Sequence, residues 1–362
     1  MRRFPLLLVI LYGVSVPAWG QAHPLAELLV REMEPTDTLR PIGARNAGEL
    51  TPAGGVRMLT FGALDGAEHE ILGGVDAVAV SPDGRLLVLD EVNSVIRIVD
   101  AEGRYLGSVG RSGRGPGDFY HPRSMAVDPK GNLYVGDLLR RVQRFRPRGT
   151  GFELDTVMTL PVSPLGLCLI DSTIVVHGFN ASAPELIHLF DQRGRKLRSF
   201  GSVYRSKNEV ISLQAASGRV ACLPRTRQIA FMPSGMIPEL RIFDEHGRTR
   251  RLSIVAGMRS NRLTETADGG SLVSSVDGPV HFVAALLAMP DGRILLQIGS
   301  IDERSRSERL SHAEMFTALL GVDPSAPVEY GRRTPQVAAF AGSRPVFLVE
   351  DPAPGIRWAR VP

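Results

Sequence analysis

Short runs of alternating apolar and polar residues, separated by turns rich in Gly, Pro and Asp, dominate the pattern of the chain from residue 76 onward. Such alternation predicts β-strands with one buried face, and Pro-Asp-Gly-type stretches predict the turns between them. The clearest hairpin pattern covers residues 78–90, Val-Ala-Val-Ser-Pro-Asp-Gly-Arg-Leu-Leu-Val-Leu-Asp. It returns at 125–137 as Met-Ala-Val-Asp-Pro-Lys-Gly-Asn-Leu-Tyr-Val-Gly-Asp, with Gly84 and Gly131 47 residues apart. A regular repeat therefore organises the chain.

Each repeat is too small to bury its own apolar faces, because it contains only a hairpin followed by a third and a fourth strand. Stacking such units around an axis gives a β-propeller, in which each repeat is one blade. The turn after the third strand recurs at 99–104, 190–195 and 243–248, and the turn between the first two strands recurs at 289–296. First strands are then expected near 166–170, 220–223 and 282, with a last group at 337–341, 346–350 and 356–361. This spacing predicts six blades, and the degenerate later repeats leave five or seven open.

One strand-like segment, 57–61, has no partner in its own neighbourhood. A propeller closes its ring when one terminus completes the blade that the other terminus began. We therefore predict an all-β, six-bladed β-propeller over residues 56–362, with 57–61 as the outer strand of the last blade. Residues 21–55 are rich in Pro, Gly and Thr and are expected to form a mobile lead-in.

Residues 310–321, Leu-Ser-His-Ala-Glu-Met-Phe-Thr-Ala-Leu-Leu-Gly, interrupt the strand pattern with helix signals. Ser311 stands at an N-cap position with Glu314 three residues later, and Gly321 offers a C-cap. The pattern predicts a helical insertion near 311–321, about nine residues long, that rides on the propeller.

The first 20 residues have the pattern of an export signal. Arg2 and Arg3 precede an apolar stretch at 6–16, and Ala-Trp-Gly at 18–20 offers a cleavage site between small residues. The apolar stretch is shorter than the roughly 20 residues that cross a bilayer. We expect a cleavable signal peptide at 1–20 and a mature protein in the periplasm or outside the cell, without a membrane span. An uncleaved, tethered product is the alternative.

Composition bounds the possible partners and the redox state. The 362 residues are 43% hydrophobic, enough for a large core, and 42 Lys and Arg exceed 38 Asp and Glu by too little to indicate nucleic-acid binding. Cys168 and Cys222 fall in the first strands of neighbouring repeats. An oxidising compartment permits a disulfide between them, although the sequence does not show that their side chains face each other. We expect two buried free thiols.

Residues 119–137, Phe-Tyr-His-Pro-Arg-Ser-Met-Ala-Val-Asp-Pro-Lys-Gly-Asn-Leu-Tyr-Val-Gly-Asp, followed by Arg-Val-Gln-Arg-Phe at 141–145, resemble an NHL repeat. The resemblance is good over the first two repeats, partial over the next two and poor in the last two. It implies a six-bladed propeller of the secreted bacterial type. The NHL family includes peptide-amidating lyases with a metal in the central channel, sensor domains of bacterial kinases, RNA-binding modules and other exported proteins. The export signal argues against the RNA-binding group.

In such a propeller, the loops between blades and the turns between second and third strands emerge on one face around the pore, which we call the loop face. Loops of this kind commonly carry binding residues. The candidates here are Asp90, Asn93, Arg111, Arg114, Asp137, Arg140 and Arg141. The arginines suit a carboxylate or an acidic partner. The equivalence of Asp90 and Asp137 in the repeat favours a scaffold role, as acceptors of backbone N–H groups, over coordination of Ca²⁺ or an amine.

Three histidines, His121, His177 and His281, are expected at strand ends beside the channel. Three imidazoles facing a channel can hold a divalent metal such as Zn²⁺ with one position open for water or substrate. We therefore name them as candidate metal ligands. No short-range ligand spacing supports such a site, and three unrelated strand-end histidines are the simpler interpretation. The sequence predicts no other cofactor.

Together these features predict an exported, monomeric and non-catalytic binding module that recognises a protein, a peptide or an envelope glycan on its loop face. The alternative is a metal-dependent hydrolase or a lyase like the peptide-amidating enzymes, with its site in the central channel. A third interpretation is the sensor part of an envelope system. A fold alone does not choose among these functions.

Overall fold

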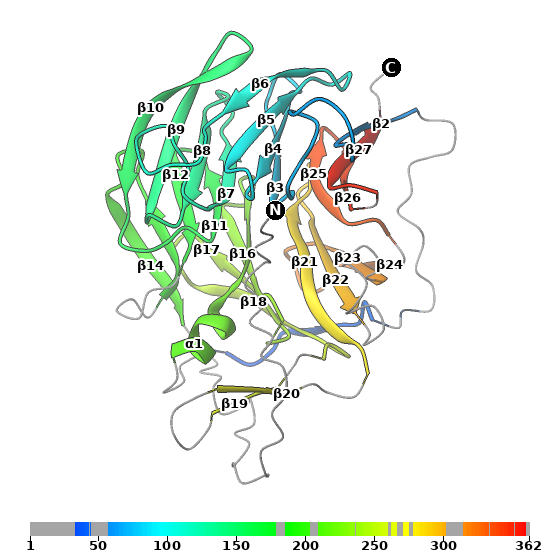
Figure 1. The fold of residues 1–362 in the computed structure, drawn as a ribbon. Helices are drawn as coiled ribbons and strands as arrows, with labels where there is room; N and C mark the ends of the chain where they lie inside the picture. The colour runs from blue at the N-terminus through cyan, green and yellow to red at the C-terminus, as the bar shows by residue number, and fades with distance from the viewer. Residues whose placement is uncertain are drawn as a thin grey trace.

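The computed structural model describes residues 33–42, 44, 57–178, 185–202, 209–235, 237–259, 262–265, 271–274, 278–301, 314–332, 334–350 and 352–359. Within them, six antiparallel sheets of four strands surround a central axis, and one sheet gains a fifth strand (Figure 1). The protein is an all-β, six-bladed β-propeller, as the repeats predict.

Each blade begins at the channel with its innermost strand and ends at the rim with its outermost strand. Blade one contains β3 (Ala77–Val80), β4 (Leu86–Asp90), β5 (Val95–Val99) and β6 (Tyr105–Val109), and blade two contains β7 (Pro122–Val127), β8 (Leu133–Asp137), β9 (Arg141–Arg148) and β10 (Gly151–Thr159). Blade three contains β11 (Gly166–Ile170), β12 (Thr173–His177), β13 (Glu185–Phe190) and β14 (Lys196–Ser202), and blade four contains β15 (Gly218–Leu223), β16 (Gln228–Pro233), β17 (Glu239–Asp244) and β18 (Thr249–Val255). Blade five contains β21 (Val280–Ala288), β22 (Ile294–Ile301), β23 (Glu314–Leu320) and β24 (Glu329–Arg332), and blade six contains β25 (Val337–Ala341), β26 (Arg344–Val349), β27 (Gly355–Ala359) and β2 (Met58–Phe61).

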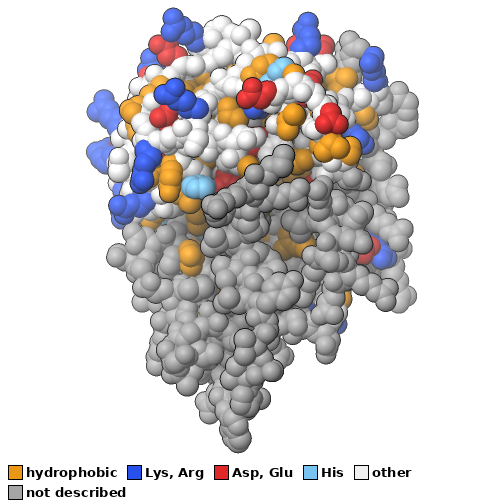
Figure 2. Space-filling model, in the orientation of Figure 1, with side chains coloured by type: hydrophobic (Ala, Val, Ile, Leu, Met, Phe, Trp, Pro, Cys, Tyr) orange, Lys and Arg blue, Asp and Glu red, His pale blue; other side chains and the backbone are white. Residues whose placement is uncertain are grey.

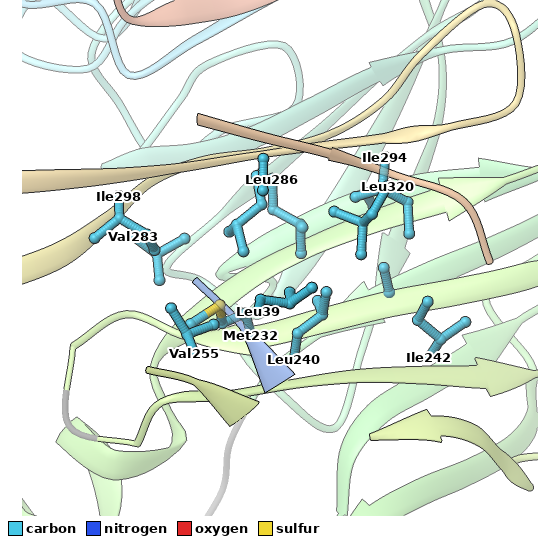
Figure 3. Packing of buried hydrophobic residues seen from close by; sticks show 14 of the residues in the cluster. Leu39, Met232, Leu240, Ile242, Val255, Val283, Leu286, Ile294, Ile298 and Leu320 are labelled. Carbon is cyan, nitrogen blue, oxygen red and sulfur yellow. The ribbon is translucent and has the colours of Figure 1, made fainter. Parts of the chain in front are cut away.

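The hydrophobic core is divided into six clusters, one between each pair of adjacent blades. Figure 3 shows the cluster between blades four and five, where Met232 and Leu240 face Val283 and Leu286. Because a central strand is covered on both faces, β4 is buried along its whole length rather than at alternate positions. The interfaces between sheets therefore supply the burial that a single repeat lacks.

The recurring Asp-x-x-Gly-Arg turn after the third strand is a hydrogen-bonded unit. Asp100 accepts the backbone N–H of Arg104 at 2.8 Å through Oδ1 and its Nε at 2.6 Å through Oδ2. Asp191 and Asp244 make the same pair of bonds in blades three and four. The repetition of this sequence thus reflects local turn stability, on the face opposite the loop face.

Strand β2 closes the ring as predicted. It pairs antiparallel with β27, with Met58 opposite Ala359 and Phe61 opposite Ile356. Gly62 follows with φ of +120°, and a Cβ there would lie 2.4 Å from the carbonyl oxygen of Pro354. Glycine is therefore required where the chain leaves this closing strand.

Strand β1 (Asp37–Leu39) is a second N-terminal attachment that the sequence does not predict. It runs parallel to β18 as the fifth strand of blade four, and Leu39 is fully buried in the cluster between blades four and five (Figure 3). The prediction of a mobile lead-in is wrong at these residues. Leu39 is packed in a hydrophobic cluster formed by residues of blades four and five, which lie far along the chain. The predicted signal peptide at 1–20 lies outside the described residues.

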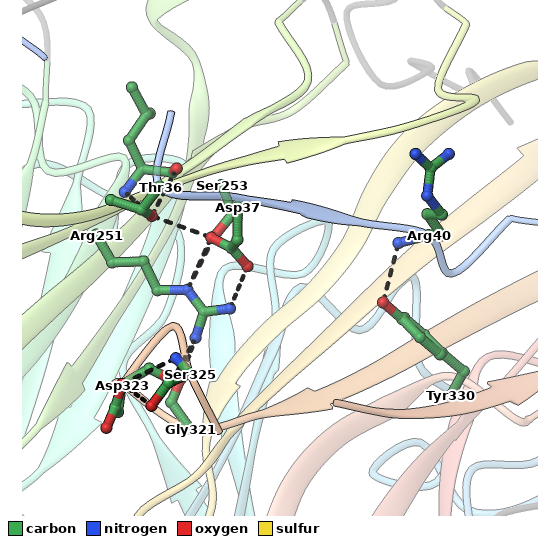
Figure 4. A network of polar contacts seen from close by, with 10 residues as sticks. Thr36, Asp37, Arg40, Arg251, Ser253, Gly321, Asp323, Ser325 and Tyr330 are labelled. Atoms are coloured by element: carbon green, nitrogen blue, oxygen red, sulfur yellow. Dashed lines mark hydrogen bonds and ion pairs between the residues drawn. The ribbon is translucent and has the colours of Figure 1, made fainter. Parts of the chain in front are cut away.

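A buried polar network holds β1 against the propeller (Figure 4). The fully buried guanidinium of Arg251 donates to both oxygens of Asp37, at 3.2 Å from Nε and 2.5 Å from Nη2. Its Nη1 donates to the carbonyl oxygen of Gly321 in blade five at 2.5 Å. The backbone N–H of Arg40 donates to the hydroxyl of Tyr330, also in blade five, at 3.0 Å. The network therefore joins β1 to two blades.

The predicted helix near 311–321 is wrong, because Glu314–Leu320 forms strand β23 in the middle of blade five. This strand pairs with β22 on one side and β24 on the other, and Met315 and Phe316 are both buried. A short apolar run is compatible with either helix or strand. Here the strand forms because β22 and β24 provide hydrogen-bonding partners on both sides. The predicted N-cap, Ser311, lies outside the described residues.

The prediction of free thiols is also wrong. Cys168 on β11 and Cys222 on β15 form a disulfide with a Cα–Cα distance of 5.7 Å. The innermost strands of blades three and four lie side by side, so both side chains meet in the cluster between these blades. Disulfides persist in oxidising compartments, and this one indicates a location outside the cytoplasm.

Two interblade connections on the loop face carry extra elements. Helix α1 (Glu209–Ala216) precedes blade four, and the hairpin of β19 (Arg262–Glu265) and β20 (Ser271–Ser274) precedes blade five. Figure 1 shows both at the same end of the molecule. Within the part of the chain that the structure describes, no helix has the length and hydrophobicity of a transmembrane span.

Candidate functional site

The channel is lined by the innermost strands of the six blades, β3, β7, β11, β15, β21 and β25. Each contacts the next around the ring. Each also follows an interblade connection, so it starts on the loop face. Side chains at the starts of these strands therefore gather around one mouth of the channel.

The repeated aspartates of the loop face belong to the scaffold. Asp90 is fully buried and accepts the backbone N–H groups of Gly73 at 3.0 Å and Asn93 at 3.1 Å, together with the Nδ2 of Asn93 at 2.7 Å. Asp137 is buried at the equivalent position and accepts Nε of Arg141 at 2.8 Å. These bonds tie each interblade loop to the turn beside it, which supports the scaffold interpretation.

Arg141 is an internal support rather than a surface binding residue. Its buried guanidinium donates to the carbonyl oxygens of Arg114 and Asp118, both at 2.9 Å. It thereby holds the loop that leads into blade two. Arg111, in contrast, is exposed and paired with Asp118 at 2.8 Å.

Arg114 and Arg140 are also exposed on the loop face. The guanidinium of Arg114 lies 4.8 Å from the ring centroid of Tyr120, a cation–π contact at the surface. On the face seen in Figure 2, Lys and Arg side chains are interspersed with Asp and Glu side chains. Of the seven predicted binding residues, Arg111, Arg114, Arg140 and Asn93 therefore offer exposed side chains.

The three candidate metal ligands are not brought together. His177 is fully buried with Nδ1 bonded to the carbonyl oxygen of Leu186 at 3.1 Å, and burial lowers its pKa to about 4. His281 accepts the backbone N–H of Arg259 at 3.0 Å, and His121 lies at the surface. Among the described residues, no group of three His, Cys, Asp or Glu side chains could hold a metal ion.

A different set of side chains meets at the channel mouth, which we call the mouth cluster. Its members are Asp76, Glu91, His121, Arg123 and Arg219. Oε1 of Glu91 lies 3.1 Å from Nδ1 of His121 and 3.7 Å from Nη2 of Arg123, whose Nη1 lies 3.9 Å from Oδ1 of Asp76. Blades one and two therefore contribute two carboxylates, one guanidinium and one imidazole to a single wall.

Local backbone structure places these side chains. Asp76 directly precedes β3 and its N–H donates to the carbonyl oxygen of Leu89 at 3.0 Å. Arg123 is the extra residue of a β-bulge, because the pairing of β7 passes from Pro122 to Ser124. Bulges change the direction of a side chain at a strand end and are frequent beside functional sites.

Arg219 enters the cluster from β15 in blade four, which lies opposite blade one in a ring of six. The residue retains solvent-accessible surface, but partial loss of hydration lowers the pKa of its guanidinium, while the charge of Asp76 opposes the shift. No hydrogen bond or ion pair to another described residue engages its guanidinium. Arg219 and Asp76 therefore interact through their charges without a hydrogen bond or ion pair between them.

Asp76 is a strongly perturbed group of the cluster. Only a quarter of its side chain is exposed, and its carboxylate accepts no hydrogen bond from the described residues. Burial raises its pKa to about 6, the charge of Glu91 adds to the increase, and Arg123 and Arg219 oppose it. A buried carboxylate without donors is costly for the fold, and such groups concentrate at functional sites.

Sequence reasoning missed Asp76, Arg123 and Arg219. A local signal exists for the first two, because each stands one residue before the Ala-Val or Ser-Met-Ala-Val run that opens a blade. For Arg219 no such signal exists, since only ring closure brings blade four opposite blade one. Glu91 and His121 lie in segments that the sequence does assign to the loop face.

Replacing Asp76 by Asn is expected to stabilise the fold by on the order of 1–2 kcal/mol at about pH 7.5. The pKa of Asp76 is about 6 in the folded protein and 3.8 in its ordinary state. Protonated Asp76 therefore adds to the free energy of unfolding fully below pH 3.8, and this contribution is lost as the pH rises through 6. Asn does not suffer this loss. Urea unfolding should show the gain at neutral pH and a smaller gain below pH 6, with Asp65→Asn, in an exposed loop, as the control. A loss of stability at neutral pH would contradict the electrostatic picture.

The fold and this cluster define a six-bladed β-propeller with a charged channel mouth. Residues 55–173, about a third of the chain, match the family model described as DUF5128, a 6-bladed beta-propeller. No curated protein matches the chain.

Solved structures share the fold at low sequence identity. A member of the DUF4221 family from Bacteroides vulgatus has a TM-score of 0.55 and 9% identity over 84% of this chain and 96% of its own. A Bacteroides fragilis protein whose export is assumed has a TM-score of 0.52 and 11% identity over 85% of this chain and 95% of its own. A streptogramin B lyase has a TM-score of 0.48 and 12% identity over 83% and 97%. At these identities the likeness shows the fold alone.

Proposed function

We propose that this propeller is an exported binding module that captures a protein, peptide or envelope glycan on its loop face, with the mouth cluster as the anchor of the ligand. The single observation that carries this proposal is the state of Asp76, which is mostly buried, accepts no hydrogen bond from the described residues and has its pKa raised to about 6. The scaffold itself does not require such a group. Where this fold buries the aspartates that repeat between blades, Asp90 and Asp137, hydrogen-bond donors compensate their carboxylates.

Export is supported by two independent features. The disulfide between Cys168 and Cys222 suits an oxidising compartment. A solved propeller of similar fold is itself assumed to be exported. A metal-dependent lyase or hydrolase remains the alternative function, and the described residues offer it no group of three metal-ligating side chains.

The test is capture from an envelope extract by the immobilised mature protein. Wild type and Arg193→Gln, a change of an exposed arginine on the opposite face, should retain the same material. Arg219→Gln should lose most of it, and the fold should persist because Arg219 makes no hydrogen bond or ion pair with a described residue. Equal retention by all three proteins would remove the mouth cluster from the binding function. Circular dichroism checks that each variant is folded.

A further inference from the structure

The two walls of the channel mouth carry opposite charges, and no ion pair among the described residues joins Asp76 to Arg219. On the wall of blades one and two, Asp76 and Glu91 share a single guanidinium, that of Arg123, at 3.9 and 3.7 Å. The buried Asp90 adds a further negative charge that acts on Asp76. This wall is therefore net negative. On the opposite wall, Arg219 carries a positive charge that makes no hydrogen bond or ion pair with a described residue and acts on Asp76 only at longer range.

The long ion-pair distances leave acceptor capacity on the negative wall. An N···O distance near 3.9 Å is too long for a hydrogen bond, so Arg123 compensates the charge of Asp76 without occupying its lone pairs. Both Asp76 and Arg123 retain part of their side-chain surface, 25% and 31% exposed, respectively. A donor group that enters the channel can therefore reach the carboxylate directly.

A ligand with one charge fits this arrangement poorly. An ammonium group alone would pair with Asp76 and Glu91 but would stand in the positive field of Arg219. A carboxylate alone would pair with Arg219 but would face two carboxylates on the other wall. Attraction and repulsion between charges are both stronger inside a protein channel than in water. A ligand with one charge therefore loses affinity through its repulsion by the like-charged wall.

Resting on the binding function proposed above, we propose that the mouth cluster binds a zwitterion, with its primary ammonium group at Asp76 and Glu91 and its carboxylate at Arg219. Free amino acids and peptides with free termini both present this pair of charges. The amine donates hydrogen bonds to the Asp76 carboxylate, which lacks donors from the described residues, and the guanidinium of Arg219 binds the carboxylate in a bidentate manner. The ligand thus spans the channel from blade one to blade four.

A series of simple zwitterions tests this assignment in isothermal titration calorimetry of the purified mature protein. The probes are glycine, β-alanine, 4-aminobutanoate, 6-aminohexanoate, diglycine and triglycine, with butylamine and butanoate as controls that carry one charge each. The best zwitterion is expected to bind at least about tenfold more tightly than either control. Its length reports the separation of the two walls, and the ranking of ω-amino acids against glycine peptides separates a free amino acid from a peptide as the natural source.

Two variants assign the ends of the ligand. Asp76→Asn should reduce the affinity of the best zwitterion to that of butanoate, and Arg219→Gln should reduce it to that of butylamine. Equal binding of zwitterions and controls with one charge would overturn the inference, as would the absence of binding by every probe at about 10 mM. If capture from the extract still depends on Arg219 in that case, the binding function stands and the ligand has another chemistry. If capture is also independent of Arg219, both proposals fail.

Discussion

Arg251→Met is expected to lower the free energy of unfolding by about 3–5 kcal/mol, because it leaves Asp37 charged and partly buried without its partner. The side chain of Arg251 is fully buried and that of Asp37 is 19% exposed. Burial acts to raise the pKa of Asp37, but the hydrogen bonds from Arg251 and Ser253 outweigh it and hold the pKa below its usual range. Chemical denaturation followed by circular dichroism measures the loss.

The neighbouring residue on the same strand is a matched control. Arg250 also pairs with an aspartate, Asp244, at 2.7 Å, but its side chain is 48% exposed. Exposed pairs contribute about 0–1 kcal/mol, so Arg250→Met should be nearly neutral. Equal losses in the two variants would show that burial does not distinguish these pairs.

The double variant Asp37→Leu/Arg251→Met separates the two origins of the loss. Removing both charges leaves no uncompensated ion, and replacing a buried pair by apolar side chains is often close to neutral. Most of the stability should therefore return. A double variant as unstable as Arg251→Met would instead assign the loss to the bond from Arg251 to the carbonyl oxygen of Gly321.

The blades could be predicted because their determinants are local. The turn at Asp100 is closed by bonds to Glu102 and Arg104, within the next four residues, so the sequence that makes it recurs wherever the turn recurs. Closure by β2 could be predicted as well. The sequence shows an unpaired strand near one terminus and a blade that lacks one strand at the other, and pairing the two completes the ring. The attachment of β1 could not, because the ion pair that holds it joins Asp37 to Arg251, 214 residues further along the chain.

The same distinction explains the candidate site. Asp90, Asp137 and Arg141 stand out in the sequence because they repeat or cluster, and the structure uses them within the scaffold. Asp76 and Arg219 do not stand out, because their significance arises from a ring that places blades one and four face to face. Repetition therefore identifies what every blade needs for folding, whereas a site at the axis is built from positions at which the blades differ.

Removal of the disulfide is expected to cost about 4 kcal/mol of stability, an effect comparable to that of Arg251→Met. The crosslink between Cys168 and Cys222 closes a loop with a sequence separation of 54, which limits the unfolded chain. In a protein of this size, such a loss should lower the melting temperature by about 6 °C. The double variant Cys168→Ala/Cys222→Ala, measured by differential scanning calorimetry, tests it.

Reductant provides the internal control for this prediction. Dithiothreitol should lower the melting temperature of the wild type towards that of the double variant and leave the double variant unchanged. Alkylation of two thiols in the native, unreduced protein would contradict the disulfide itself.

Because the crosslink joins the innermost strands of blades three and four, its loss should loosen the ring beside β15, the strand that carries Arg219. If the channel mouth binds zwitterions as proposed, their binding should then weaken in the reduced protein even below its melting temperature.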